Sequence, residues 1–148
     1  MDAPHAQSWL GWMVLPLRRY ARFKGRSGRR EFWFYSLFLG LGYLAIVLLA
    51  FAIAIASPES ETLIGSIFVG GWLLIFAANF VPGLALTTRR LHDMGLSGAL
   101  LIVIFAALAI LNVVGWLGYL VWMSLPGQRQ ENRHGLPIGH HDVSEVFL

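Results

Sequence analysis

The sequence contains no cysteine and few charged residues. Without cysteine, the chain can form no disulfide, present no thiolate nucleophile and bind no metal through sulfur. Only 13% of its 148 residues are Asp, Glu, Lys or Arg, whereas a soluble domain usually carries about 25%. Because 57% are hydrophobic, too little polar surface is available to cover a water-soluble globule. These scarcities argue against a soluble enzyme, a secreted disulfide-bonded domain or a disordered tail.

Three long stretches lack every Asp, Glu, Lys and Arg: residues 32–56, 63–86 and 96–125. A helix needs roughly 20 apolar residues to cross a hydrocarbon core of about 30 Å, so the first two stretches each suit one span. Isolated strands cannot cross lipid, because their backbone groups would stay unpaired. The sequence therefore predicts an all-α polytopic integral membrane protein that forms a single membrane domain over residues 1–148.

The third apolar stretch has two alternative interpretations. As a single helix, residues 99–123 would extend about 37 Å and cross the membrane with some tilt. Asn112 and Gly115 lie near its centre, however, and both residue types favour turns over lipid-facing helix. A break there would produce a short helical hairpin. One span and a hairpin both remain open at this point.

Basic residues gather on one side of the predicted spans. Residues 1–31 carry a net charge of +5, whereas the short segment 57–62 carries −2 and no base. Because positive residues stay cytoplasmic, we expect a multi-pass inner-membrane protein with a cytoplasmic N-terminus and a cytoplasmic loop over residues 87–98. The polar tail, residues 124–148, has two arginines close to the membrane. This placement favours a cytoplasmic C-terminus and hence the hairpin.

The segment before the first span, residues 8–31, mixes aromatic and basic side chains. Its aromatics recur every three or four residues, which is typical of an amphipathic helix lying in the membrane interface. We expect Pro16 to break or kink this helix and leave only the residues from Leu17 onward regular. Its bases suit anionic headgroups or serve as a topology signal, and before a span they need no nucleic-acid partner. The predicted interfacial anchors are Trp9, Trp12, Tyr20, Phe23 and Trp33.

Three short polar stretches flank the apolar blocks: FKGRSGRREFW at 23–33, RRLHDMGLSG at 89–98 and PGQRQENRHG at 126–135. In order and spacing they resemble the bacterial domain of unknown function 805 family, which comprises small YhaH-like inner-membrane proteins. That family shows F-x-G-R-x-x-R-x-E-[FY]-W, R-R-L-H-D-x-x-x-S-G and G-x-x-x-x-N-R-F-G patterns. Here His134 replaces the usual aromatic residue of the third pattern. The resemblance implies an inner-membrane location and this architecture, but no reaction.

In the hairpin arrangement, all three polar stretches would face the cytoplasm and their arginines would surround Glu31 and Asp93. Arginine suits bidentate pairing with a carboxylate or a phosphate. One hypothesis is an inter-helix clamp, in which each acid is bonded by an arginine from another stretch. The other hypothesis is a pocket for an anionic headgroup. The candidate residues are Arg26, Arg29, Arg30, Glu31, Arg89, Arg90, His92, Asp93, Asn132 and Arg133.

We predict no catalytic, metal or cofactor site from these residues. His92 and Asp93 are neighbours, and adjacent residues on a helix point roughly 100° apart, so they cannot readily form a catalytic pair. The His-His-Asp tail at 140–142 lacks a third firm ligand position and makes a weak metal site. Ion-coupled transport is disfavoured, because the apolar blocks hold no acidic or basic residue.

These observations predict a non-enzymatic inner-membrane protein whose cytoplasmic Arg/His/Asp/Glu face binds anionic lipid or a protein partner. An accessory subunit of a transport or envelope-stress complex is the alternative. A lipid-active enzyme that uses His92 and Asp93 is a third possibility. Small residues at helical spacing, such as Ser66 and Gly70, suit either internal packing or association with a second copy.

Overall fold

The computed structural model describes residues 8–138, and the His-His-Asp tail at 140–142 lies outside them. Within the described residues the chain forms four helices and, apart from one isolated bridge, no β-structure. Three of these helices have the length and composition of a membrane span when α4 is counted from end to end. The predicted all-α polytopic class is therefore confirmed. The helices are α1 (Trp9–Arg18), α2 (Arg29–Ala56), α3 (Glu61–Asp93) and α4 (Leu100–Ser124).

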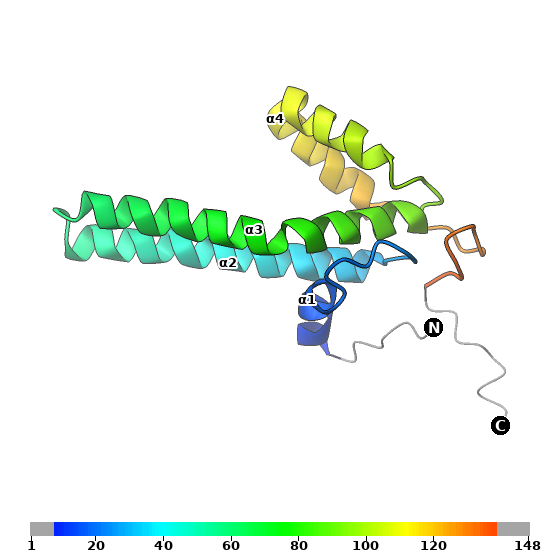
Figure 1. The fold of residues 1–148 in the computed structure, drawn as a ribbon, viewed down its shortest axis with the longest axis horizontal. Coiled ribbons are helices and arrows are strands. Elements are labelled where there is room, and N and C mark those ends of the chain that lie inside the picture. Colours follow the sequence, from blue (N-terminus) through cyan, green and yellow to red (C-terminus); the bar gives the residue numbers. More distant parts are fainter. Residues whose placement is uncertain (1–7, 139–148) are drawn as a thin grey trace.

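Helices α2 and α3 form a long antiparallel pair joined by a short turn (Figure 1). With 28 and 33 residues, they extend about 42 Å and 50 Å at 1.5 Å per residue. Both exceed a hydrocarbon core of about 30 Å, and both are longer than the spans predicted at 32–56 and 63–86. We call the end where α2 begins and α3 finishes the polar end.

The end of α3 corrects one expectation, because residues 89–93 lie in its last turns and not in a loop over 87–98. The helix ends at a glycine instead. Gly95 has a φ of +77°, its N–H donates to the His92 carbonyl at 3.0 Å, and the Leu96 N–H donates to the Leu91 carbonyl at 2.9 Å. This pattern closes a helix with a left-handed glycine. The basic pair of this stretch is thereby held on rigid helix.

Helix α4 adopts the hairpin alternative. Its backbone leaves the helical region at Asn112, where φ is +47° and ψ is −121°, and its two arms then run side by side back to the polar end (Figure 1). Asparagine tolerates positive φ better than most residues. Gly115 permits the close approach, because an added Cβ would lie 2.9 Å from the Ala107 carbonyl oxygen. Each arm of about twelve residues extends about 18 Å, which is less than the hydrocarbon thickness.

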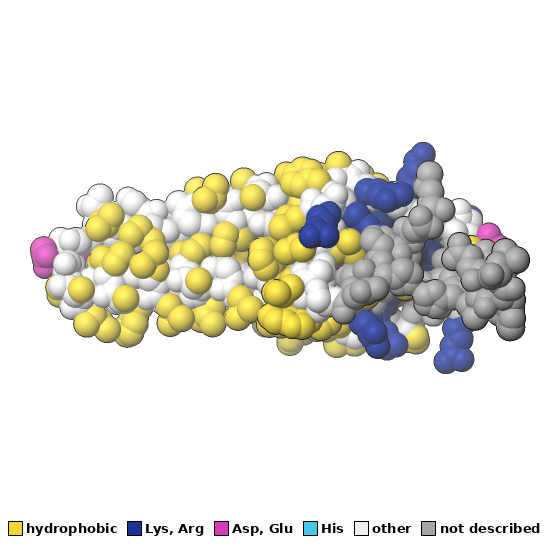
Figure 2. Space-filling model, turned by 90° about the horizontal axis from the view of Figure 1, so that it is seen from below, with side chains coloured by type: hydrophobic (Ala, Val, Ile, Leu, Met, Phe, Trp, Pro, Cys, Tyr) yellow, Lys and Arg dark blue, Asp and Glu magenta, His cyan; other side chains and the backbone are white. Residues whose placement is uncertain are grey.

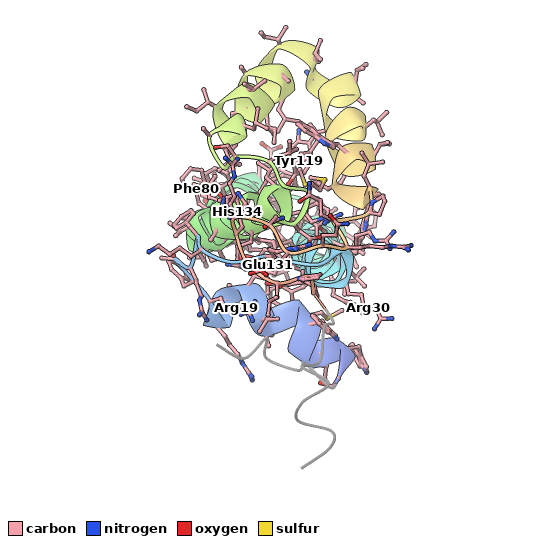
Figure 3. All side chains as sticks on the ribbon, turned by 90° about the vertical axis from the view of Figure 1, so that its right-hand side faces the viewer. Arg19, Arg30, Phe80, Tyr119, Glu131 and His134 are labelled. Atoms are coloured by element: carbon pink, nitrogen blue, oxygen red, sulfur yellow. The ribbon has the colours of Figure 1, made fainter. Side chains whose placement is uncertain are left out.

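Helix α1 runs across the long pair at the polar end (Figures 1 and 3). Ser8 caps it by accepting a hydrogen bond from the Gly11 N–H at 3.1 Å. The expected break at Pro16 was wrong, because the helix continues through Pro16 and ends at Arg18. Proline removes one backbone donor, and burial of this stretch against the other helices offsets that loss in a short helix. The buried residues of α1 are Met13, Leu15 and Pro16.

The predicted interfacial anchors divide into two groups. Trp12 is half-buried, so part of the aromatic stripe of α1 packs on protein and does not face lipid. The other four anchors have exposed side chains, which leaves them able to lie at the membrane surface. These exposed anchors are Trp9, Tyr20, Phe23 and Trp33.

The hydrophobic core also lies near the polar end, where α2, α3 and both arms of α4 meet. Further along the long pair, large apolar side chains such as Phe51 and Leu74 are exposed. Exposed apolar surface of this extent suits contact with lipid. The core residues are Phe32, Tyr35, Leu86, Leu91, Ile104 and Met123.

Candidate functional site

Asp93, on the last turn of α3, lies between two arginines. Its Oδ1 accepts a hydrogen bond from Arg26 Nε at 2.9 Å and lies 2.8 Å from Arg26 Nη2. Its Oδ2 accepts a hydrogen bond from Arg90 Nη1 at 2.5 Å. All three side chains are buried, at 7% exposure or less. Charge-assisted bonds of this kind are stronger than neutral ones, so the cluster fixes the loop before α2 against α3.

The same two arginines hold the chain that follows α4. Arg26 Nη1 donates to the carbonyls of Gln130 at 3.0 Å and Gly135 at 3.3 Å. Arg90 Nε donates to the Met123 carbonyl at 3.1 Å, and its Nη2 donates to the Leu125 carbonyl. The last carbonyls of a helix have no partner within the helix. Arg90 therefore satisfies the end of α4 and holds the hairpin against α3.

Glu31, in the first turn of α2, is the second buried acid. Its Oε1 accepts a hydrogen bond from Arg89 Nη2 at 2.8 Å, and its Oε2 accepts one from Ser27 Oγ at 2.5 Å. Arg19, just after α1, lies 3.6 Å from Oε2 through Nη1. This group joins the ends of α1, α2 and α3 in the way that an inter-helix clamp requires.

The buried cluster contains more positive than negative charge. Arg19, Arg26, Arg89 and Arg90 surround only two carboxylates, and backbone carbonyls accept many of the remaining donors. Burial lowers the pKa of Arg19 and Arg90, and the nearby carboxylates oppose that shift. Arginine nevertheless stays protonated in proteins. The cluster is therefore a charged structural junction.

His92 contacts both the loop before α2 and the tail that follows α4. Its Nδ1 donates to the Gly25 carbonyl at 3.2 Å, and its ring stacks on His134 with centroids 3.7 Å apart. Asn132 Nδ2 donates to the His92 carbonyl at 3.0 Å. Desolvation by burial lowers the pKa of both histidines. Because both oxygens of Asp93 are bonded to arginines, the Asp93 carboxylate is not free to orient the His92 imidazole.

Three of the predicted site residues, Arg29, Arg30 and Arg133, lie outside the buried cluster. Arg29 and Arg30 are exposed at the start of α2, and among residues 8–138 their side chains have no ion pair or hydrogen bond. Arg30 points away from the helices in Figure 3. Arg133 is exposed and donates to His134 at 3.0 Å. The residues that the structure brings together are Arg26, Glu31, Arg89, Arg90, His92, Asp93 and Asn132.

The headgroup hypothesis does not extend to Arg89 and Arg90. Their exposures are 1% and 0%, and both are bonded to acids. Arg19 and Ser27 also contact Glu31, although neither is among the residues predicted from the sequence. Ser27 lies inside the first polar stretch and could have been included on that ground, whereas Arg19 is distinguished from its basic neighbours only by the path of the chain. Within the described residues, no group of three His, Asp or Glu could hold a metal.

Comparisons with known proteins agree with the architecture. Residues 20–136 match the family described as "Protein of unknown function (DUF805)". The chain is 31% identical to the Escherichia coli K12 inner membrane protein YhaI over 124 residues, which cover 84% of this chain and 92% of YhaI. It is 29% identical to the inner membrane protein YhaH of the same strain over 126 residues, covering 85% and 94%. No solved structure matches.

Proposed function

Because the chain belongs to the DUF805 family, whose function is unknown, we propose a function from its geometry. The protein is a small, non-enzymatic inner-membrane protein whose polar end binds the headgroups of anionic phospholipids. The observation that carries this proposal is the division of the bases into two sets. One set is buried and bonded to Glu31 and Asp93, and the other set is exposed.

The exposed set is strongly unbalanced in charge. At the polar end of the described chain, seven bases are exposed together with one acid, Glu131. Figure 2 shows the Lys and Arg side chains toward one end of the molecule, and acidic side chains at the opposite tip, where α2 turns into α3. Each base near an anionic membrane surface contributes about 1 kcal/mol. The exposed bases are Arg18, Arg22, Lys24, Arg29, Arg30, Arg129 and Arg133.

The same distribution supports a cytoplasmic polar end. Bases near spans stay in the cytoplasm, and the opposite turn carries Glu59 and Glu61 without any base. The hairpin form of α4 returns the chain to the polar end. In this orientation α1 lies along the inner leaflet, where its exposed Trp9 supplies an interfacial anchor.

Lipid retention through purification tests this function. In a native mass spectrum of the detergent-solubilised full-length protein, we expect phosphatidylglycerol or cardiolipin to be retained over phosphatidylethanolamine. A variant with Arg18, Lys24, Arg29 and Arg30 changed to Gln should lose that preference. The control with Glu59→Gln and Glu61→Gln, at the opposite tip, should keep it. Equal retention of both lipid classes by the unmodified protein contradicts the proposal.

A second function, as a subunit of a membrane complex, is favoured by the apex of the hairpin. Asn112 is exposed there, and its non-helical backbone interrupts the helix about 18 Å from the polar end. Irregular backbone at membrane depth is tolerated where protein or water covers it. Because the chain has no native cysteine, Asn112→Cys introduces a single thiol. If oxidation in membranes produces a disulfide-linked dimer, that result supports a second copy of the chain at the apex. A protein that purifies as a monomer without any associated protein contradicts the subunit hypothesis.

A further inference from the structure

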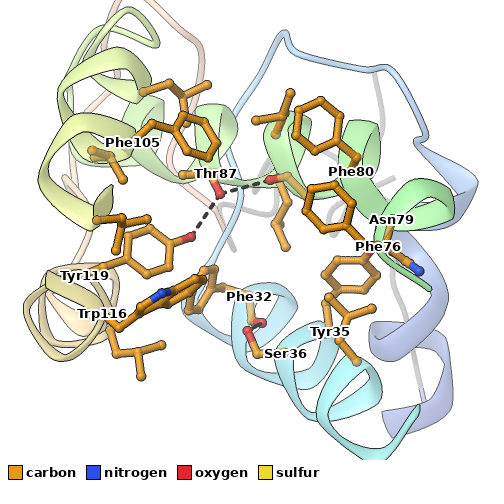
Figure 4. Close-up of a pocket in the computed structure, with 18 of the residues that line it drawn as sticks. Phe32, Tyr35, Ser36, Phe76, Asn79, Phe80, Thr87, Phe105, Trp116 and Tyr119 are labelled. Carbon is orange, nitrogen blue, oxygen red and sulfur yellow. Dashed lines mark hydrogen bonds between the residues drawn. The ribbon is translucent and has the colours of Figure 1, made fainter. Parts of the chain in front are cut away.

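A partly open cavity of about 710 Å³ lies between α2, α3 and both arms of α4 (Figure 4). This volume falls within the range of roughly 300–1,000 Å³ that is usual for small-molecule sites. All three helices contribute aromatic rings to its wall, including Phe32, Phe76 and Trp116. The cavity is separate from the buried ion cluster and is not used by it.

Most polar groups in the cavity wall already have partners, the exceptions among the wall residues being the Tyr43 hydroxyl and the Trp116 indole N–H. Tyr35 donates its hydroxyl hydrogen to Asn79 Oδ1 at 2.7 Å. Thr87 Oγ1 donates to the Gly83 carbonyl at 2.9 Å, so the Tyr119 hydroxyl is left to donate to Thr87 Oγ1 across 3.0 Å. A polar ligand would therefore find few free hydrogen-bonding groups here. The wall suits a hydrocarbon chain.

The cavity is long and extends along the apolar part of α3. Its wall includes Phe76 and Thr87 of α3, which are eleven residues apart and therefore separated by about 16 Å along the helix. Up to residue 86, this part of α3 belongs to the apolar block 63–86, which carries no acidic or basic residue. The cavity is therefore placed to receive a chain from the surrounding lipid.

One exposed arginine, Arg29, lies on the same face of α2 as the cavity wall. On α2 the wall residues Phe32, Ser36 and Gly40 recur at helical spacing, and Arg29 precedes Phe32 by three residues on the same face. Arg29 is exposed, and its side chain has no ion pair or hydrogen bond within residues 8–138. A phosphate held by Arg29 would thus lie about one helical turn from the wall of the cavity.

We propose that this cavity holds one acyl chain of an anionic phospholipid whose phosphate pairs with Arg29. The proposal rests on the lipid-binding function above and assigns a specific site to it. Charge selects the headgroup at the rim, and the aromatic wall accommodates the tail. Arg30, which points away from the helices, contributes only to the general attraction.

Photolabelling in membranes tests the site. The full-length protein is reconstituted with phosphatidylglycerol that carries a diazirine midway along one acyl chain, and labelled peptides are mapped. The matched probe is phosphatidylethanolamine with the same labelled chain. We expect phosphatidylglycerol to label cavity-wall residues such as Phe80 and Phe105 in preference to the outward-facing Ile102 and Val121. We expect phosphatidylethanolamine to show no such preference.

Two glycine variants separate occupancy of the cavity from general lipid contact. An added Cβ meets nothing within 4 Å at either Gly40 or Gly70, but only Gly40 lines the cavity. Gly40→Phe should reduce phosphatidylglycerol labelling of the wall, while Gly70→Phe should leave it unchanged. Arg29→Gln should lower that labelling by about fivefold, the ratio that corresponds to about 1 kcal/mol for one base near the surface, and Arg30→Gln should lower it less.

The outcomes distinguish this site from the broader function. Equal labelling of the wall in the Gly40 and Gly70 variants overturns the cavity site, and so does equal labelling by the two probes. If the preference of the purified protein for anionic lipid nevertheless persists, the headgroup function stands without the cavity. If that preference is also absent, both proposals fail.

Discussion

Gly127 packs directly against the carboxylate of Asp93. A Cβ added to Gly127 would overlap the Asp93 side chain, which is already held by Arg26 and Arg90. The next residue of the tail, Gln128, donates its N–H to the Asp93 carbonyl at 2.8 Å. The third polar stretch can therefore dock on the end of α3 only because position 127 has no side chain.

This contact predicts a strong effect from a single methyl group. Gly127→Ala should lower the thermal midpoint in detergent, because overpacking a filled site typically costs about 1–3 kcal/mol. Gly118→Ala is the matched control, since an added Cβ there meets nothing within 4 Å. Scanning fluorimetry of the two purified variants provides the measurement. If both melt at the temperature of the unmodified protein, the tail is not docked as described.

Removal of a buried acid should destabilise the protein more than removal of an exposed one. Asp93→Ala leaves Arg26 and Arg90 buried without a carboxylate, and an uncompensated buried charge typically costs about 3–5 kcal/mol. Glu59→Ala is the comparison, because Glu59 is exposed in the α2–α3 turn. The difference should appear as a lower thermal midpoint for Asp93→Ala alone. Equal and negligible changes in the thermal midpoints of the two variants would show that the ion pairs of Asp93 do not stabilise the protein.

Acidification should weaken the docking of the tail. Burial lowers the pKa of His92 and His134 below the ordinary value of 6.5, so the unfolded chain binds protons more readily than the folded chain. The stability that the neutral pair contributes is therefore present above about pH 6.5 and is lost as pH falls toward the lowered values. Arg133 next to the pair acts in the same direction.

The variant His134→Gln tests this assignment, because it removes the second titrating ring. Thermal midpoints measured at pH 7.5 and pH 5.5 should fall less for the variant than for the unmodified protein. A variant that loses as much stability on acidification as the unmodified protein would show that other groups dominate the pH dependence.

The hairpin makes a topological prediction. With the N-terminus in the cytoplasm, a protein with a straight α4 would have its C-terminus outside, whereas the hairpin keeps it inside. A C-terminal green fluorescent protein should therefore be bright and a C-terminal alkaline phosphatase inactive. In cells with a permeabilised outer membrane, Ser60→Cys should react with an impermeant thiol reagent, and Lys24→Cys, which is exposed at the polar end, should not. Active phosphatase contradicts the hairpin, and labelling of position 24 alone contradicts the orientation.

The membrane class of this protein could be predicted from the sequence, because the signal is local. A run of apolar residues as long as 32–56 cannot be covered in water, and it has the length that lipid requires. The three polar stretches could also be singled out, since each directly flanks an apolar block. Whether the three stretches come together depends on whether α4 is straight or folded into a hairpin. The sequence alone could not decide this, because Asn112 permits a break without requiring one.

Tertiary structure alone decided what each base does. Arg29 and Arg89 have the same chemistry and similar positions beside a span, yet one is exposed and the other is buried against Glu31. Arg19 likewise contacts Glu31, while the adjacent Arg18 is exposed. A sequence records that a side chain is charged, but pairing depends on which helix ends come together around it. Here the closure of the α4 hairpin and the crossing of α1 remove some arginines from water and leave the others at the surface.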